Sequence, residues 1–286
     1  MPTTLTTRDG LGLQLRHWPC TPAVGTVLVV HGLGEHCGRH DGLARRLNSW
    51  GWHVVGFDQR GHGTSEGPRG RLTADDDLLH DLALVIDHVR SARPGRLVLL
   101  GHSMGGLVAA RFVAGGVGAP PAWYREVDAL ALSSPALDAG LGRGQALLLG
   151  LLGRVAPDLA VGNGLKPAWI SRDPEVVRAY EADPLVHDRV SARLVRFIVD
   201  GGIAVEAAAP RWRMPTLLMF AGSDRCVAPA GSTRFAQAAP RHLVSTREFK
   251  ALYHEIFNEP EREQVLDALH AWLGTSLAST PPSRHG

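Results

Sequence analysis

The stretch Leu99–Phe112, LLGHSMGGLVAARF, begins as a buried strand, ends as a helix and places Ser103 at the bend between them. The pattern GHSMGG is typical of a nucleophile elbow, a sharp strand-to-helix turn on which the serine has strained backbone dihedral angles. Gly101 and Gly105 stand two residues either side of the serine, where the backbone passes too closely for a side chain. We therefore predict that Ser103 Oγ is exposed at the carboxyl edge of a sheet, where open α/β folds bind ligands.

A plainer interpretation of the same stretch is a glycine-rich turn whose serine only caps the next helix. The order of elements favours the elbow, because a strand precedes the serine and a helix follows it, as the motif requires. The helix beginning near Met104 would also point its free N–H groups and the positive end of its dipole at the reacting centre.

The sequence around the elbow alternates between short apolar runs and helical patterns. Continuous apolar strands separated by helices predict a mostly parallel sheet covered by helices on both faces. The predicted strands are Thr26–Val30, His53–Asp58, Arg96–Leu100, Ala129–Ser134 and Pro215–Gly222. Between the second and third strands, apolar residues recur at helical spacing over Leu78–Val89, after a start signal at Thr73 and Asp76 and before the sequence RPG. This pattern predicts the crossover helix.

The regular alternation breaks after Pro135, and the next clear strand comes only at Pro215. A loop of that length without structure of its own is uncommon in a compact domain, and the segment contains helical patterns. We therefore predict a helical cap inserted between two core strands. The predicted units are a first core part, 1–136; the cap, 137–210; a second core part, 211–275; and a disordered tail, 276–286, with too few apolar residues to pack.

Composition and charge narrow the class of protein. The chain has 286 residues, 44% of them apolar, which is enough for a full core. Its formal charge of +2 is spread without a basic block, which argues against a nucleic-acid partner. Three scattered cysteines, Cys20, Cys37 and Cys226, fit a reducing compartment, and no apolar stretch approaches the roughly 20 residues that span a bilayer. With no export signal at the N-terminus, we expect a cytoplasmic protein.

A serine hydroxyl needs a base to take its proton, and the base needs an orienting carboxylate. In this fold the acid and the histidine follow the serine in that order. Asp224, in FAGSDRCVAP, lies just beyond the last clear apolar strand, and His254, in REFKALYHEIFNEPER, lies between a plausible strand and a helix starting near Glu259. Both fall where strand ends converge, although Asp224 could be a turn residue and His254 a surface histidine.

Other residues of the same types compete for these roles. His242 follows a proline in a loop and His270 sits inside the final helix, so neither has a strand end to hold it. Asp200 is the first alternative for the acid, because it lies close to the end of the cap.

An oxyanion hole in this fold uses the N–H of the residue after the nucleophile and an N–H from the loop after an early strand. The first is Met104, and the loop VVHGLGEH, which turns on Gly32 and Gly34, makes Leu33 the second donor. The loop DQRGHGTSEG, Asp58–Gly67, is predicted to form the floor beneath it.

The histidines His31, His36 and His40 fall within ten residues of one another and raise the alternative of a metal site. Loop histidines without helical or hairpin spacing specify no ligand geometry, so we predict neither a metal nor any other cofactor.

Six segments carry a resemblance that extends over nearly the whole chain up to about Gly274. They are HGLGEHCGRH, DQRGHGTSEG, GHSMGG, EADPLVHDRVSARL, GSDRCV and YHEIFNE. With them the chain resembles the monoacylglycerol lipase and lysophospholipase family of the α/β-hydrolase superfamily. The elbow alone identifies only the superfamily, whereas the HGxGEH loop and the DPLVH segment are more particular to this branch. His40 stands where a tyrosine is usual and Ala182 where an asparagine is usual, which leaves the exact substrate open.

The resemblance implies an α/β-hydrolase fold with a helical cap and the same site residues: Ser103 as nucleophile, Asp224 and His254 as its partners, Leu33 and Met104 as oxyanion donors. It implies hydrolysis of a carboxylic ester with one medium or long acyl chain, above all a monoacylglycerol, without a cofactor. Alternatives are a broad-specificity carboxylesterase, a lysophospholipase or an acyltransferase, and, outside the enzymes, a ligand receptor on a hydrolase fold. An aspartate nucleophile, normal for dehalogenation and epoxide opening on this fold, is absent from position 103.

The cap in this family lines an apolar tunnel for the acyl chain, which implies transient contact with a membrane surface through the cap. The apolar run Ala146–Leu152 is too short to span a membrane. It either forms an entrance at a lipid interface or packs the cap onto the core. The sequence indicates neither the natural ester nor the oligomeric state.

Overall fold

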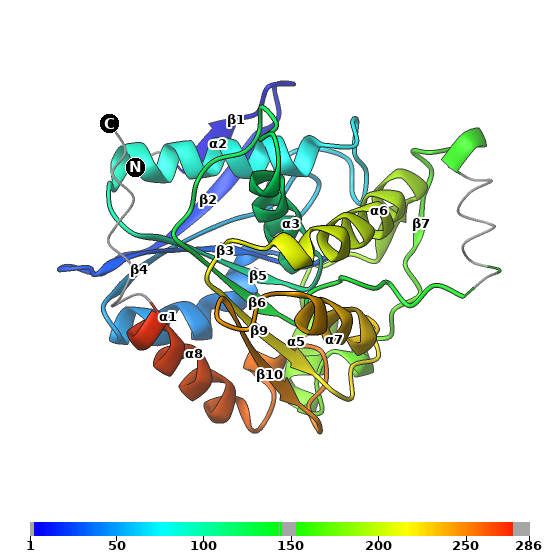
Figure 1. Cartoon of the computed structure of the whole chain (residues 1–286). Coiled ribbons are helices and arrows are strands. Elements are labelled where there is room, and N and C mark those ends of the chain that lie inside the picture. The colour runs from blue at the N-terminus through cyan, green and yellow to red at the C-terminus, as the bar shows by residue number, and fades with distance from the viewer. Residues whose placement is uncertain (1–2, 143, 145–152, 277–286) are drawn as a thin grey trace.

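The computed structural model describes residues 3–142, 144 and 153–276, and these form a central sheet between two layers of helices (Figure 1). In this described part the sheet has eight strands in the order β1-β2-β4-β3-β5-β6-β9-β10. Their bounds are β1 (Thr4–Thr6), β2 (Gly12–Trp18), β3 (Gly25–Val30), β4 (Trp52–Phe57), β5 (Leu97–His102), β6 (Ala129–Ser133), β9 (Thr216–Ala221) and β10 (Val244–Phe249). All pairs from β4 to β10 are parallel, which confirms the predicted sheet.

The five predicted strands form the continuous middle of the sheet, each within two residues of its predicted bounds. They are buried along almost their whole length, because helices cover both of their faces. The antiparallel strands β1 and β2 at one edge were not predicted. β1 has only three residues, and β2 mixes apolar with charged and imidazole side chains, so neither gives a continuous apolar run.

Helices on the two faces bury separate clusters of apolar side chains against the sheet. One face is covered by α2 (Asp77–Ala92), α3 (Ser103–Ala114), α6 (Ala192–Ala208) and α7 (Pro229–Ala238), and the other by α1 (Asp41–Ser49) and α8 (Arg262–Ser276) (Figure 1). Leu82 and Ile86 of α2 are buried in the first cluster, and Leu47 of α1 and Leu269 of α8 in the second. Burial of each such side chain contributes about 1.5–3 kcal/mol.

Two helices begin later than predicted. The crossover helix α2 starts at Asp77, whose carboxylate accepts hydrogen bonds from the N–H groups of Thr73 and Ala74. It ends at Ala92, before the predicted RPG stop. The last helix starts at Arg262 and not near Glu259, whose carboxylate accepts hydrogen bonds from the N–H groups of Arg172 and Tyr253.

The segment between β6 and β9 contains short elements and a long helix. They are β7 (Ala160–Gly162), the 3-10 turn η3 (Pro167–Trp169), α5 (Pro174–Ala182), β8 (Arg189–Ser191) and α6. β7 pairs with β8 antiparallel, and α6 packs against α3 of the core. The cap boundaries 137–210 therefore stay a prediction, with α6 as the helix that joins the cap to the core.

Two predictions fall largely outside the described residues: the apolar run Ala146–Leu152 and the tail 276–286, of which only Ser276 is described, as the end of α8. Among the helices that are described, none is long and apolar enough to cross a membrane.

Candidate active site

Ser103 occupies the bend between β5 and α3 with a left-handed backbone conformation, φ +53°. The two flanking glycines are required by close backbone contacts. A Cβ at Gly101 would lie 2.5 Å from the carbonyl oxygen of Gly105, and a Cβ at Gly105 would lie 2.2 Å from that of Val30. The sharp turn is therefore fixed by the glycines, and the serine side chain is presented at the carboxyl edge of the sheet, as the elbow motif predicts.

Asp224 and His254 meet at the same edge, on the loops that follow β9 and β10. His254 Nδ1 donates to Asp224 Oδ2 over 2.7 Å. The other carboxylate oxygen, Oδ1, accepts the N–H groups of Cys226 at 2.8 Å and Val227 at 3.1 Å. These bonds hold the carboxylate in place, and a proton on Nδ1 leaves Nε2 of the ring as the basic nitrogen.

The pKa of His254 is raised above its ordinary value. The ring is 5% exposed, and burial by itself lowers the pKa because it disfavours the charged imidazolium. The Asp224 carboxylate opposes this through charge and hydrogen bonding, and the carboxylates of Glu255 and Glu35 add to it. The charged form of the ring is therefore well supported in the site, as a general base requires when it receives a proton.

Ser103 and His254 line one cavity together with Gly32 and Leu33 of the oxyanion loop, which follows β3. A Cβ added to Gly32 would lie 3.1 Å from the Cβ of Ser103, so the loop passes directly over this serine. Met104, the other proposed oxyanion donor, is buried in the first turn of α3. Three of the five predicted site residues, Ser103, His254 and Leu33, thus line the cavity, while Asp224 is bonded to His254 and Met104 follows Ser103 in α3.

The oxyanion loop is held from inside by a buried carboxylate that the sequence analysis did not identify. Glu35 Oε1 accepts the N–H of Gly32 over 2.6 Å. His40 Nε2 donates to the same oxygen over 3.2 Å, and Arg39 donates to the other over 3.2 Å. Burial opposes the charge of Glu35, but His40 and Arg39 hold its pKa well below its usual range. An ionised Glu35 therefore fixes the peptide next to Leu33.

One wall of the cavity carries further charges that were not predicted. Arg39 donates to both carboxylate oxygens of Glu255, and its guanidinium lies 4.7 Å from the centre of the Tyr180 ring. We call Glu35, Arg39, Tyr180 and Glu255 the polar wall, since all four line the cavity. Arg39 stands four residues after Glu35 and Glu255 directly follows His254, but only the folded chain shows that these positions face one another.

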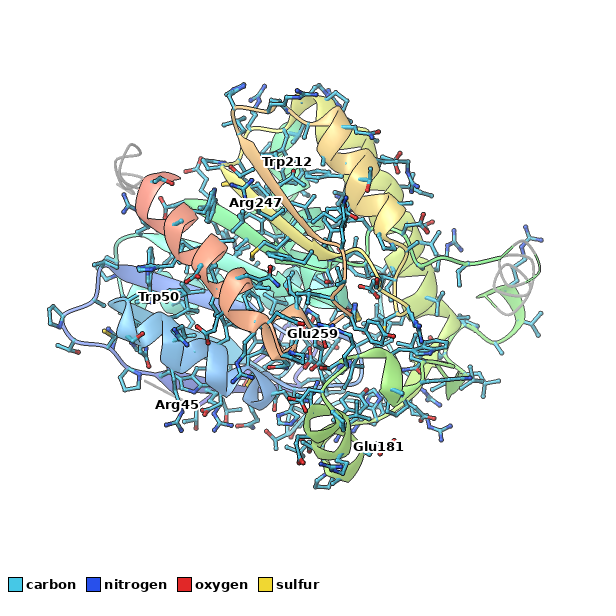
Figure 2. The ribbon with its side chains drawn as sticks, turned by 90° about the horizontal axis from the view of Figure 1, so that it is seen from below. Arg45, Trp50, Glu181, Trp212, Arg247 and Glu259 are labelled. Carbon is cyan, nitrogen blue, oxygen red and sulfur yellow. The ribbon has the colours of Figure 1, made fainter. Side chains whose placement is uncertain are left out.

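The cap reaches the oxyanion loop through the DPLVH segment. His36 Nε2 donates to Asp183 Oδ2 over 2.8 Å, and the N–H of His187 donates to the carbonyl of Gly34 over 2.9 Å. Glu259, labelled in Figure 2, precedes α8 and also contacts the cap, because its carboxylate accepts the N–H of Arg172 over 2.6 Å.

The loop Asp58–Gly67 lies beneath the oxyanion loop, as predicted. Gln59 Nε2 donates to the carbonyl of His31 over 2.7 Å, and the N–H of Gln59 donates to His31 Nε2 over 2.9 Å. The rings of His31, His36 and His40 are thus bonded to three different partners, Gln59, Asp183 and Glu35. The structure does not bring these rings together as a ligand set.

The competing residues lie elsewhere. Asp200 is exposed on α6 beside Arg196, His242 is exposed, and His270 stacks on Trp50 with the ring centres 4.3 Å apart. None of the three is paired with His254 or Ser103 in the described structure, so Asp224 is the acid that the fold supplies to the histidine.

Comparison with known proteins places the chain in one family. The family described as "Serine aminopeptidase, S33" matches residues 21–261. A monoacylglycerol lipase of Mycolicibacterium smegmatis is 34% identical over 263 residues, covering 91% of each chain. A phospholipase of Bacillus subtilis is 33% identical over 261 residues, covering 89% of this chain and 97% of its own.

Solved structures agree in fold. A monoacylglycerol lipase of Paleococcus ferrophilus has a TM-score of 0.80 at 35% identity and covers 91% of this chain and 98% of its own. A soluble variant of the monoglyceride lipase of Saccharomyces cerevisiae, in complex with a substrate analogue, has a TM-score of 0.84 at 21% identity, with 95% and 94% covered. The second likeness bears on the fold alone.

Proposed function

Since this chain belongs to the "Serine aminopeptidase, S33" family of α/β-hydrolases and is a carboxylic ester hydrolase, we propose that it cleaves monoacylglycerols with a medium or long acyl chain through Ser103, His254 and Asp224. The observation that carries the proposal is the 2.7 Å bond from His254 to Asp224 at a cavity that Ser103 also lines. A base, its orienting acid and a serine on a strained elbow are the parts of an acyl-enzyme mechanism.

The proposed reaction has two halves. His254 Nε2 takes the proton of Ser103 as Oγ attacks the ester carbonyl, and the negative oxygen that forms accepts hydrogen bonds from the N–H groups of Leu33 and Met104. Collapse expels the alcohol, which takes the proton from His254. Water then repeats the attack on the acyl-serine, with His254 again as base, and the fatty acid leaves. The dipole of α3 points its positive end at the oxyanion throughout.

The charges of the polar wall support a substrate whose alcohol part is neutral over one whose alcohol part carries a phosphate. Glu35 and Glu255 bring two buried negative charges, and Arg39 is already occupied by both of them. A phosphate would therefore face two carboxylates with Arg39 already bound to both, and the ammonium of Lys166, which also lines the cavity, lies over the Trp169 ring, 5.6 Å from its centre. Hydroxyl groups, in contrast, donate to carboxylates readily. Glycerol fits this chemistry, and a lysophospholipid head group fits it poorly.

Exposed apolar side chains of the cap support the proposal that the substrate is a lipid ester and that the protein contacts a lipid surface. Four of the exposed large apolar side chains of the described residues lie on this segment: Val155, Leu159, Val161 and Leu165. Leu165 and the neighbouring Lys166 also line the catalytic cavity, so the exposed apolar face continues into the mouth of the site. We propose that this face meets lipid transiently while the acyl chain enters.

The direct test compares kcat/KM for decanoylglycerol and decanoyl lysophosphatidylcholine in the wild-type protein, with Ser103→Ala as the inactive control. We expect the glycerol ester to be preferred at least about tenfold, since one unfavourable charge contact of about 1.4 kcal/mol gives that ratio. Ser103→Ala should lose several orders of magnitude in rate at unchanged thermal stability, because the glycines set the turn.

The alternatives have distinct outcomes in the same assay. Equal or better cleavage of the phospholipid would make the protein a lysophospholipase; the relative in Bacillus subtilis is named a phospholipase. Ester products formed with an added alcohol would indicate an acyltransferase. Labelling of Ser103 by a fluorophosphonate without turnover of any ester would indicate a receptor.

A further inference from the structure

We propose that Asp224, Cys226 and His254 form a binding site for a thiophilic divalent cation such as Zn²⁺, and that the bound ion switches the active site off. Each residue offers one ligand atom, and the three atoms lie within 4.8 Å of one another. In the part of the chain that the structure describes, no other group of histidine, cysteine and acidic side chains meets this condition. The inhibition by the bound ion rests on the proposed role of His254 as the catalytic base, whereas the binding of the ion does not depend on that role.

The donor set and its spacing suit zinc. Zinc accepts sulfur, imidazole nitrogen and carboxylate oxygen in a tetrahedral arrangement, with neighbouring ligand atoms about 3.3–3.7 Å apart. His254 Nδ1 and Asp224 Oδ2 stand 2.7 Å apart and would have to separate slightly, while the thiol would approach by roughly 1 Å at most. The fourth position would face the cavity, where water is available as a ligand.

The charges around the three ligands attract a cation. The carboxylates of Asp224, Glu255 and Glu35 lie in this region, and the Arg39 guanidinium pairs with the last two. The two other nearby cations of the described residues lie over aromatic rings, Arg225 over Tyr253 and Lys166 over Trp169. Burial and the negative charges of Asp224 and Glu255 raise the pKa of the Cys226 thiol. Without a cation, these surroundings therefore disfavour the deprotonated thiolate. A dication reverses that balance, because it replaces the thiol proton with two positive charges. One proton is released for each ion bound, and binding tightens as the pH rises.

An ion can reach the ligands from the cavity. Cys226 and His254 both line it, and Cys226 is partly exposed. The other two cysteines are differently placed: Cys37 is buried beneath the oxyanion loop, and Cys20 lies near Asn48 at the end of α1. Cys20 is therefore a matched control, since it is also partly exposed but belongs to no such group of three ligands among the described residues.

Inhibition follows from the tautomer of His254. The active base carries its proton on Nδ1, where Asp224 accepts it, and keeps a lone pair on Nε2. A metal ion on Nδ1 displaces this proton to Nε2, and the neutral ring then cannot accept a proton from Ser103. The ion also occupies the Asp224 oxygen that orients the ring. Zinc therefore acts here opposite to a catalytic metal, and a chelator should raise the rate of a zinc-loaded preparation.

The first experiment measures ester hydrolysis against free Zn²⁺ in the wild-type protein and in the variants Cys226→Ala, Cys226→Ser and Cys20→Ala. We expect reversible inhibition of the wild type and of Cys20→Ala, with recovery on adding a chelator. With inhibition expressed relative to each variant's own zinc-free rate, both Cys226 variants should need at least about tenfold more zinc for the same fractional inhibition, because the soft ligand is lost. Unchanged zinc sensitivity in both Cys226 variants, or equal loss in Cys20→Ala, would overturn the proposal.

The second experiment is independent of turnover and uses Co²⁺ as a probe in the Ser103→Ala protein. Thiolate ligation to cobalt gives a charge-transfer absorption band in the near ultraviolet, which Zn²⁺ should abolish by displacement. The band should appear in Ser103→Ala and be missing from Ser103→Ala/Cys226→Ala. If the band is absent from Ser103→Ala, the proposed metal site is wrong, even if the ester hydrolase assignment stands. Its presence would support the site even if the substrate proved different.

Discussion

The backbone N–H of His187, in the cap, donates to the carbonyl oxygen of Gly34, in the oxyanion loop, over 2.9 Å. The contact is close on both sides, because a Cβ on Gly34 would lie 2.2 Å from the carbonyl oxygen of His187. Gly34 also has φ +75°, a conformation that L side chains rarely adopt. The cap and the loop that carries Leu33 are therefore fitted to each other, and a change at this contact should be felt in catalysis.

Gly34→Ala tests this coupling. The added methyl group must push the loop or the cap aside, and removal of one oxyanion donor typically costs 10²–10³ in rate. We expect kcat to fall by at least about tenfold for short and long acyl esters alike, with a smaller change in KM. Gly42→Ala is the matched control, since its Cβ meets nothing within 4 Å and it lies in the exposed start of α1. Equal rates in both variants would show that the contact is only structural.

Asp224→Asn should impair the rate far more than substrate binding. The amide favours the wrong tautomer of His254, an effect that reaches about 10⁴ in kcat in serine hydrolases with the same constellation. We expect a fall in kcat of about 10³ or more at similar KM. Asp200→Asn, on the exposed surface of α6, should behave like wild type. Steady-state kinetics with a p-nitrophenyl ester measure both, and a near wild-type Asp224→Asn would refute the assignment of the acid.

The pH dependence of kcat/KM should have a rising limb with its midpoint above about 6.5. Only the neutral ring of His254 accepts a proton, and its pKa is raised, so the active fraction grows as the pH passes through a value higher than that of a free histidine. Glu255→Gln removes one of the carboxylates that raise it and should move the midpoint to lower pH. Glu261→Gln, an exposed control, should leave the midpoint in place. A midpoint near 6 in the wild type would contradict the charge arrangement described here.

Acid should destabilise the fold through His53. The ring is 1% exposed, neither nitrogen has a hydrogen-bond partner among the described residues, and burial, then Arg93 and His17, lowers its pKa to about 4. The unfolded chain takes up the proton near pH 6.5, so stability is full above that value and is lost as the pH falls towards 4. His53 should therefore lower the free energy of unfolding by about 2 kcal/mol as the pH falls from 7.5 to 5.

His53→Phe removes the titrating group while keeping a ring of similar size. Urea unfolding at pH 7.5 and 5 should show that the variant loses about 2 kcal/mol less than the wild type over this interval. His242→Phe changes an exposed histidine and serves as control. The same pH sensitivity in wild type and His53→Phe would mean that His53 is not kept neutral by the fold.

Substrate size should discriminate strongly. Each methylene removed from water contributes about 0.8 kcal/mol, so kcat/KM should climb with chain length until the acyl site is full. A triacylglycerol must place two further chains beside a cavity walled by Arg39, Tyr180 and Glu255. We expect good cleavage of monoacylglycerols of roughly 8 to 14 carbons and at least about hundredfold slower cleavage of emulsified long-chain triacylglycerols, about 2.7 kcal/mol in the transition state. Comparable values would indicate a general lipase.

The sequence by itself determined the features that depend on neighbours along the chain. The elbow at Ser103 is readable because the glycines that permit it stand at fixed spacing from it. The central strands are readable because helices bury both of their faces, which demands continuous apolar runs. Asp224 and His254 could be proposed because parallel strands end at one edge of the sheet, so a residue just past a strand belongs to that edge.

Only the tertiary structure decided how separate segments meet at that edge. Glu35 and Glu255 are 220 residues apart in number, yet both bond to Arg39, and nothing in either local sequence announces the pairing. The contact of His187 with Gly34 is of the same kind. Such contacts depend on backbone paths that are fixed by the packing of the whole sheet. A carboxylate or a glycine in a loop can serve many local roles, so its presence in the sequence does not predict a particular distant partner. The sequence therefore specified the proposed reacting groups, and the fold specified the charges and the cap that surround them.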